Sequence, residues 1–177
     1  MIKKRRIFLI GNPAAGRNAL KKIKEAFAAI KSSGYDVQML LTEKRGDAES
    51  FAREISQMQD AGYKIQDKSI VNHESCIMII AAGGDGTYNE VINGIAYTEI
   101  PLAILPLGTT NVLAKELGIP EDAGKALSIA LGARTHNVCL GKITLSSQIS
   151  RYFCLMAGIG YDAETVYGIK DEIKKYS

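Results

Sequence analysis

The sequence predicts an α/β fold, a parallel sheet with helices on both faces, followed by the start of a β-rich second domain. Through residue 132, apolar runs of strand length alternate with helical patterns. Most of these runs are apolar throughout, which is typical of parallel strands buried on both faces. After residue 132 the rhythm changes to two strand patterns joined by a short turn, which indicates an antiparallel pair.

The expected elements follow from hydrophobic spacing and from turn residues. Strands are expected at residues 7–10, 37–41, 77–82, 102–105, 135–145 and 151–159. Helices are expected at residues 16–32, 47–58, 87–97, 110–117 and 122–131. Asp47 is a candidate cap for the second helix. The polar, aperiodic segment from Gly62 to Ser75 is expected to form a long surface loop.

Composition limits the classes of function. The 177 residues are 46% hydrophobic and 23% charged, as in an ordinary globular domain. The cysteines Cys76, Cys139 and Cys154 form no C-x-x-C pair, which argues against a disulfide framework and against zinc. The first 24 residues contain no acidic residue. This basic end suggests a phosphate or an acidic membrane face as neighbour, or simply a solvated surface. A nucleic-acid partner is disfavoured, because no aromatic residues interleave with the basic residues of this end.

The strongest motif runs from Gly83 to Glu90, where an apolar strand enters the sequence Gly-Gly-Asp-Gly-Thr-Tyr-Asn-Glu. Glycines permit tight turns and close approach of a ligand to the backbone. The helix start that follows offers N–H groups and partial positive charge, which suit phosphate. Asp85 is unusual here because a carboxylate repels phosphate. A bound Mg²⁺ or a ribose hydroxyl would explain it, whereas a tight turn capped by Asp85 is the plainer alternative.

Two further turns follow other strands. One is Gly11-Asn12-Pro13-Ala14-Ala15-Gly16, and the other is Leu105-Pro106-Leu107-Gly108-Thr109-Thr110-Asn111. Each is a weak signal alone, and the last three residues of the second turn could simply cap a helix. In a parallel sheet, however, all three turns lie at the carboxyl ends of strands, which is the edge where such folds bind ligands.

Together these segments resemble the diacylglycerol kinase catalytic domain. The shared motifs are Asn12-Pro-x-x-Gly16, Gly83-Gly-Asp-Gly-Thr-x-Asn-Glu90 and Pro106-Leu-Gly-Thr-x-Asn111, in matching order across roughly residues 5–165. The Gly-Gly-Asp-Gly-Thr motif also occurs in NAD kinases and phosphofructokinases. The third motif, followed by Leu113-Ala-Lys-Glu-Leu-Gly-Ile-Pro120, is similar to the bacterial lipid kinases.

The resemblance implies a Rossmann-like nucleotide-binding kinase domain over residues 1–132 and the beginning of an incomplete β-sandwich domain over residues 133–177. It implies ATP and Mg²⁺ as cofactors and a lipid alcohol such as diacylglycerol as phosphoryl acceptor. By position it assigns nucleotide contacts to Asn12, Pro13, Gly16, Thr42, Gly83, Gly84, Asp85, Gly86, Thr87, Asn89, Glu90 and Thr109. Asp85 is also assigned a catalytic role, through the metal or its waters. The family's base and metal-binding loop fall beyond Ser177, so residues 1–177 are expected to bind nucleotide without efficient catalysis.

A lipid acceptor implies transient contact with a membrane surface and a cytoplasmic location at the inner membrane face. Assembly into a homo-oligomer is left open by the sequence. Two alternatives remain: an NAD kinase-like phosphotransferase that acts on a ribose hydroxyl, and a regulatory nucleotide-binding fragment without catalysis.

Overall fold

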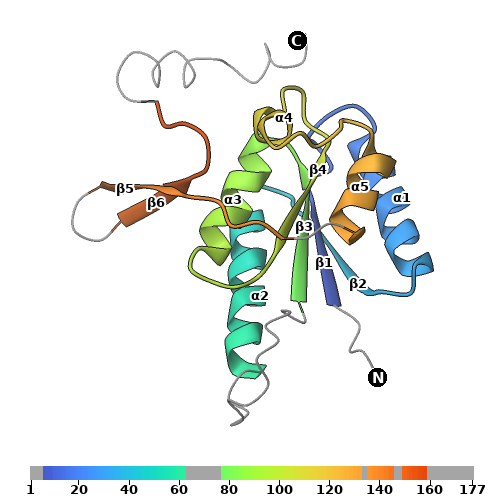
Figure 1. The fold of residues 1–177 in the computed structure, drawn as a ribbon, viewed down its shortest axis with the longest axis horizontal. Helices are drawn as coiled ribbons and strands as arrows, with labels where there is room; N and C mark the ends of the chain where they lie inside the picture. The colour runs from blue at the N-terminus through green and yellow to red at the C-terminus, as the bar shows by residue number, and fades with distance from the viewer. Residues whose placement is uncertain (1–5, 63–76, 133–134, 146–148, 159–177) are drawn as a thin grey trace. The chain divides into compact units, whose positions relative to one another are not determined.

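The computed structural model describes residues 6–62, 77–132, 135–145 and 149–158. The chain divides into two compact units, between Asn137 and Val138. The first unit contains a four-stranded parallel sheet (Figure 1). Its strands, in spatial order, are β2 (Asp36–Leu41), β1 (Arg6–Gly11), β3 (Ile77–Gly83) and β4 (Leu102–Pro106).

Helices cover both faces of this sheet (Figure 1). On one face lie α1 (Ala19–Ser32) and α5 (Ala123–Gly132), and on the other lie α2 (Asp47–Gly62) and α3 (Asp85–Ile95). The short helix α4 (Val112–Glu116) follows β4. The predicted α/β fold with a parallel, helix-covered sheet is therefore confirmed.

The core explains why the central strands are apolar throughout. Successive residues of a strand point to opposite faces of the sheet. In β1, Ile7 and Leu9 are fully buried in the core cluster that includes Ile23 of α1. Phe8 and Ile10, which point the other way, are at most 2% exposed. Both faces of β1 are thus packed, which is the property that the continuous apolar run indicates.

Four helices begin at a residue other than the expected one, and α4 and α5 do so by only two residues and one residue, at Val112 and Ala123. Helix α1 begins at Ala19 because Asn18 adopts a left-handed backbone with φ of 60°. Helix α3 begins earlier than expected, at Asp85 inside the glycine motif. Asp47 does begin α2, but its carboxylate accepts the backbone N–H groups of Glu43 and Lys44, each at 2.9 Å. Asp47 therefore holds the turn before the helix instead of capping the helix itself.

The second unit contains an antiparallel pair, β5 (Gly141–Leu145) and β6 (Ile149–Phe153). The antiparallel pairing is as predicted, but β5 is shorter than expected, since residues 135–140 have no regular secondary structure. Strand β6 begins two residues before the expected strand and ends at Phe153, since residues 154–158 are not extended in a strand. The β-sandwich itself stays a prediction. The turn at 146–148 and the loop predicted for 62–75, apart from Gly62, lie outside the described residues.

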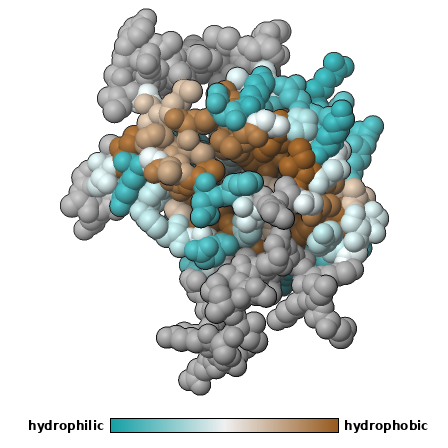
Figure 2. All heavy atoms as spheres, viewed as in Figure 1, coloured by the Kyte–Doolittle hydropathy of each residue, from teal (hydrophilic) through white to brown (hydrophobic). Residues whose placement is uncertain are grey.

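The surface carries both hydrophilic and hydrophobic areas. The face drawn in Figure 2 shows a band of hydrophobic residues bordered by hydrophilic ones. Among the described residues, no helix combines the length and apolar character needed to cross a membrane.

Candidate functional site

The three turns singled out in the sequence meet at the carboxyl edge of the sheet. Backbone hydrogen bonds join them directly. The N–H of Asn12 donates to the carbonyl of Ala82 at 2.9 Å, which links the first turn to β3. The N–H groups of Leu107 and Gly108 both donate to the carbonyl of Gly83, at 2.7 and 3.0 Å. The end of β3 is therefore the centre to which the other two turns attach.

Glycine allows the turns to touch. A Cβ atom on Gly108 would lie 2.7 Å from the Cα of Gly84, and one on Gly84 would lie 3.3 Å from the Cα of Gly108. A Cβ atom on Gly16 would overlap the carbonyl oxygen of Leu107. Since backbone atoms cannot move aside as a flexible side chain can, these positions have little room for a side chain. The glycines thus pack the turns against each other, a role that the motif alone did not reveal.

Gly86 has different surroundings. It lies exposed in the first turn of α3, and a Cβ atom there would meet nothing within 4 Å. Gly84 occupies the N-cap position and, having no side chain, makes no capping hydrogen bond to α3. The start of a helix carries partial positive charge. The described residues therefore leave open space beside the start of α3, where an anionic group can approach.

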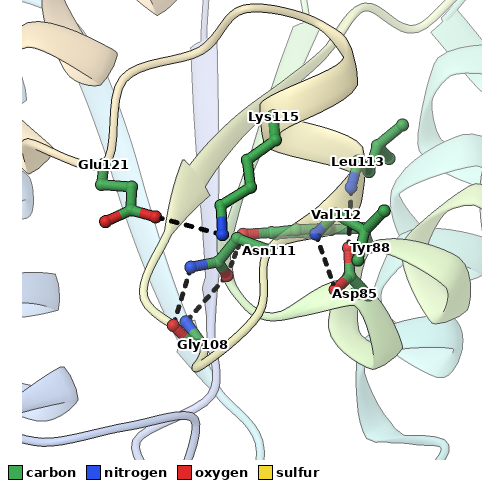
Figure 3. Close-up of polar contacts among 8 residues, drawn as sticks. All are labelled: Asp85, Tyr88, Gly108, Asn111, Val112, Leu113, Lys115 and Glu121. Carbon is green, nitrogen blue, oxygen red and sulfur yellow. Dashed lines mark hydrogen bonds and ion pairs between the residues drawn. The ribbon is translucent and has the colours of Figure 1, made fainter.

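Asp85 links α3 to α4 (Figure 3). Its Oδ2 accepts the backbone N–H of Val112 at 3.0 Å, and its Oδ1 accepts that of Leu113 at 3.0 Å. Both donors belong to the first turn of α4, where N–H groups have no partner within the helix. Asp85 therefore caps a helix that starts 27 residues further along the chain.

Asn111 stands at the N-cap of α4 with φ of 48°, yet its side chain makes no capping hydrogen bond. Instead its Oδ1 accepts the N–H of Gly108 at 3.0 Å, and its Nδ2 donates to the carbonyl of Gly108 at 2.7 Å (Figure 3). Thr109 and Thr110 are exposed. The alternative in which Asn111 caps the helix is wrong, because this side chain closes the preceding turn.

Tyr88 is a site residue that sequence reasoning missed. Its side chain is fully buried, and its hydroxyl donates to the carbonyl of Gly83 at 2.6 Å. The carbonyl of Leu105 and the Oδ1 of Asn111 lie 3.4 and 3.5 Å from the same oxygen. Burial, and then the charge of Asp85, raise the pKa of Tyr88 well above its usual range. The hydroxyl therefore stays protonated and remains a donor.

A signal for Tyr88 was present in the sequence. The buried residues of α3 include Tyr88, Val91, Ile92 and Ile95, which follow the spacing of one helix face. A tyrosine on a buried face needs a partner for its hydroxyl. In the structure that partner is the carbonyl of Gly83, the last residue of β3.

The first turn and the end of β2 complete the edge. Asn12 and Pro13 are half-buried, and the Oδ1 of Asn12 accepts the N–H of Ala14 at 2.9 Å. This bond closes a local turn of the type that asparagine favours. Thr42 is buried, and its N–H donates to the carbonyl of Gly11 at 2.9 Å. Both segments thus lie at the carboxyl edge, as expected.

The remaining candidates vary in exposure. Thr87 is buried, and a Cβ atom on Gly83 would overlap its side chain. Asn89 is exposed and Glu90 is half-buried, both further along α3, and Thr109 is exposed in the third turn. The structure brings Gly16, Gly83, Gly84 and Asp85 together with residues 107–113. Contact with a nucleotide stays a prediction for every candidate.

Metal binding also stays a prediction. Within the described part of the chain, no three His, Cys, Asp or Glu side chains gather where they could hold a metal ion. A nucleotide-bound Mg²⁺ takes most of its ligands from phosphate and water, so a single carboxylate is compatible with it.

Comparison with known proteins agrees with this arrangement. Residues 6–143 match the family model described as the diacylglycerol kinase catalytic domain. Diacylglycerol kinases of Staphylococcus aureus strains JH9 and Newman are each 32% identical to the chain over 176 residues, which cover 97% of this chain and 49% of the relative. The chain thus spans about half the length of the curated relatives that it matches.

A solved structure of a diacylglycerol kinase also resembles this chain. The crystal structure of a diacylglycerol kinase from Bacillus anthracis str. Sterne aligns with a TM-score of 0.56 at 30% identity, covering 77% of this chain and 42% of that chain. The fold is an α/β domain whose three glycine turns join at the carboxyl edge of a parallel sheet. The chain belongs to the diacylglycerol kinase catalytic domain family, which confirms the resemblance found in the sequence.

Proposed function

We propose that the protein containing this chain is an ATP-dependent lipid kinase. It transfers the γ-phosphoryl group to a lipid hydroxyl such as that of diacylglycerol. One observation carries the proposal: Gly84 and Gly108 pack against each other just before Gly86, where an added Cβ atom in the first turn of α3 would meet nothing within 4 Å. A family whose relatives are named diacylglycerol kinase supplies the reaction class.

The proposed site works by placing phosphates against backbone N–H groups. The start of α3 provides partial positive charge, and the absence of a side chain on Gly86 leaves room for a phosphate to approach. Bound Mg²⁺ would neutralise charge on the transferring phosphoryl group. The lipid oxygen attacks the γ-phosphorus, the bond from phosphorus to the ADP oxygen breaks, and the hydroxyl proton passes to a base. We expect that base in the second domain of the full-length protein.

The test is a transfer assay on the full-length gene product. The enzyme is mixed with ATP labelled on the γ-phosphate and with vesicles that contain diacylglycerol, and the lipid fraction is counted. We expect label in the lipid only when Mg²⁺ and enzyme are both present. Transfer to NAD but not to lipid would replace the proposal with the NAD kinase-like alternative. Nucleotide binding without transfer to either acceptor would favour a regulatory nucleotide-binding protein.

A further inference from the structure

The carboxylate of Asp85 is fully engaged with the backbone of α4. Each of its two oxygens accepts one N–H, from Val112 or from Leu113, and both distances are 3.0 Å. Hydrogen bonds from N–H groups to an ionised carboxylate are stronger than those between neutral groups. The N-cap residue of α4, Asn111, makes no capping bond of its own, so among the described residues the cap comes from Asp85.

The link matters because of what lies at its two ends. Asp85 is the first residue of α3, and Gly84 just before it packs against Gly108 of the third turn. Asn111 holds both the N–H and the carbonyl of Gly108, immediately before α4 begins. The side chain of Asp85 therefore ties the start of α3 to the start of α4, which directly follows the turn that packs on Gly84 (Figure 3).

The same link resolves the difficulty of a carboxylate beside a phosphate site. The first N–H groups of a helix carry partial positive charge, and a carboxylate placed on them is partly neutralised. The charge of Asp85 lies on the start of α4. The start of α3 is thereby left available to an anionic ligand.

We propose that Asp85 is a positioning residue of the nucleotide site. It fixes residues 108–113 against the start of α3 and does not need a metal ion to do so. The inference rests on the proposed function, since it assumes that nucleotide binds at this edge. It differs from the metal-holding role that the motif suggests for Asp85.

The two roles separate when nucleotide binding is measured without metal. The variant is Asp85→Asn in the full-length protein, with ATP affinity measured by calorimetry in Mg²⁺ and again in EDTA. An amide can accept only one of the two N–H groups, and its own NH₂ opposes the other. We expect ATP affinity to fall about tenfold in both conditions, the equivalent of losing one charge-assisted hydrogen bond. If Asp85 held the metal, affinity would fall in Mg²⁺ alone, and metal-free binding would be unchanged or tighter. That result would overturn the inference.

Asp122→Asn is the matched control. The Oδ1 of Asp122 accepts the N–H of Lys125 at 2.8 Å at the start of α5, a single local bond that an asparagine can keep. We expect this variant to bind ATP like the wild type. An equal loss of affinity in Asp122→Asn would show a general effect of removing a carboxylate charge from a helix start and would also overturn the inference.

Tyr88→Phe provides a second test that leaves the carboxylate untouched. It removes the hydroxyl that donates to the carbonyl of Gly83, the group that also accepts the N–H groups of Leu107 and Gly108. We expect a smaller loss of ATP affinity, about threefold, again with and without Mg²⁺.

Hydrogen exchange should rise at residues 108–117 in Asp85→Asn and stay slow in β1. A wild type that binds ATP, with both variants unchanged, would contradict the inference but not the proposed function. A wild type that fails to bind ATP would contradict both.

Discussion

Gly84 and Gly86 stand two residues apart in one motif but meet different surroundings. Gly84 packs against the backbone of Gly108, whereas a side chain on Gly86 would enter open space. The motif predicted a glycine-rich edge but not the different roles of the two glycines, because the role of Gly84 depends on Gly108, which lies in another turn. Tyr88 shows the same limit, since its partners are carbonyl and amide groups brought in by folding.

The open space at Gly86 leads to a direct test of ligand approach. We expect Gly86→Val to leave the fold and the melting temperature nearly unchanged, because no atom lies within 4 Å of the new Cβ. ATP affinity of the full-length protein should fall at least about tenfold, since the side chain occupies the space proposed for phosphate. Calorimetry measures the affinity and circular dichroism the melting temperature.

Gly132→Val is the control for Gly86→Val. Gly132 likewise has nothing within 4 Å of an added Cβ, but it ends α5, away from the three turns. ATP affinity should be unaffected there. Normal ATP binding by Gly86→Val would mean that the phosphates lie elsewhere.

The raised pKa of Tyr88 predicts how stability depends on pH. A buried phenol is favoured in its neutral form, so the folded protein resists ionisation that the unfolded chain undergoes near the ordinary value of 10.0. The stabilisation is fully present below that pH and is lost as pH rises toward the folded pKa. We expect the free energy of unfolding to fall above pH 10 or so, and to fall less steeply in Tyr88→Phe. Denaturant titrations at several pH values measure it, and identical slopes for the two proteins would contradict the assignment.

Helix α3 carries the glycine motif from Asp85 onward and packs tightly on α2. A Cβ atom on Gly94 would lie 2.6 Å from the Cβ of Ala52 and 2.7 Å from the carbonyl oxygen of Glu49. Helix α3 can therefore approach α2 closely only with glycine at this position. Since Asp85 begins the same helix, the packing at Gly94 also sets where the site lies.

We expect Gly94→Val to destabilise the protein, because the added side chain would force the two helices apart. Overpacking of this kind costs about 1–3 kcal/mol, which denaturant unfolding can measure. Gly132→Val serves again as the control and should be close to neutral. Wild-type stability in Gly94→Val would show that α2 and α3 can separate without cost.

How far the elements could be predicted depended on their length and surroundings. The long helices and the buried strands were predicted because their hydrophobic periods are strong. Helix α4 was overestimated, since a helix of five residues has too few turns to show a period and ends where Gly118 takes φ of 66°. The hydrogen bond from α4 to Asp85 could not be predicted from the sequence, because the two segments are 27 residues apart and neither contains a pattern that indicates contact with the other.

At the scale of the whole molecule, the basic N-terminal region is the feature that the proposed site does not use. Lys21, Lys22 and Lys24 are exposed on α1, and Lys21 lies 3.8 Å from Glu25 in a solvent-exposed pair. Exposed pairs of this kind contribute little to stability. Because α1 follows the carboxyl end of β1, its first turn starts at the edge that carries the three turns. These lysines can thus serve a membrane surface or the nucleotide itself.

We predict that this basic region docks the full-length protein on anionic membranes. Each Lys near such a surface contributes about 1 kcal/mol, over a Debye length of about 8 Å at physiological salt. Replacing Lys3, Lys4, Lys21 and Lys22 with Gln should weaken binding to vesicles of anionic phospholipid at least about tenfold and leave ATP affinity nearly unchanged. Vesicle sedimentation measures the binding to vesicles, and calorimetry measures the ATP affinity.

The control replaces Lys31, Lys115, Lys125 and Lys142 with Gln, which changes the net charge equally at other positions. If both variants lose vesicle binding alike, net charge rather than a docking face is responsible. If vesicle binding persists and ATP affinity falls, the lysines serve the nucleotide, and the membrane contact lies in another part of the protein.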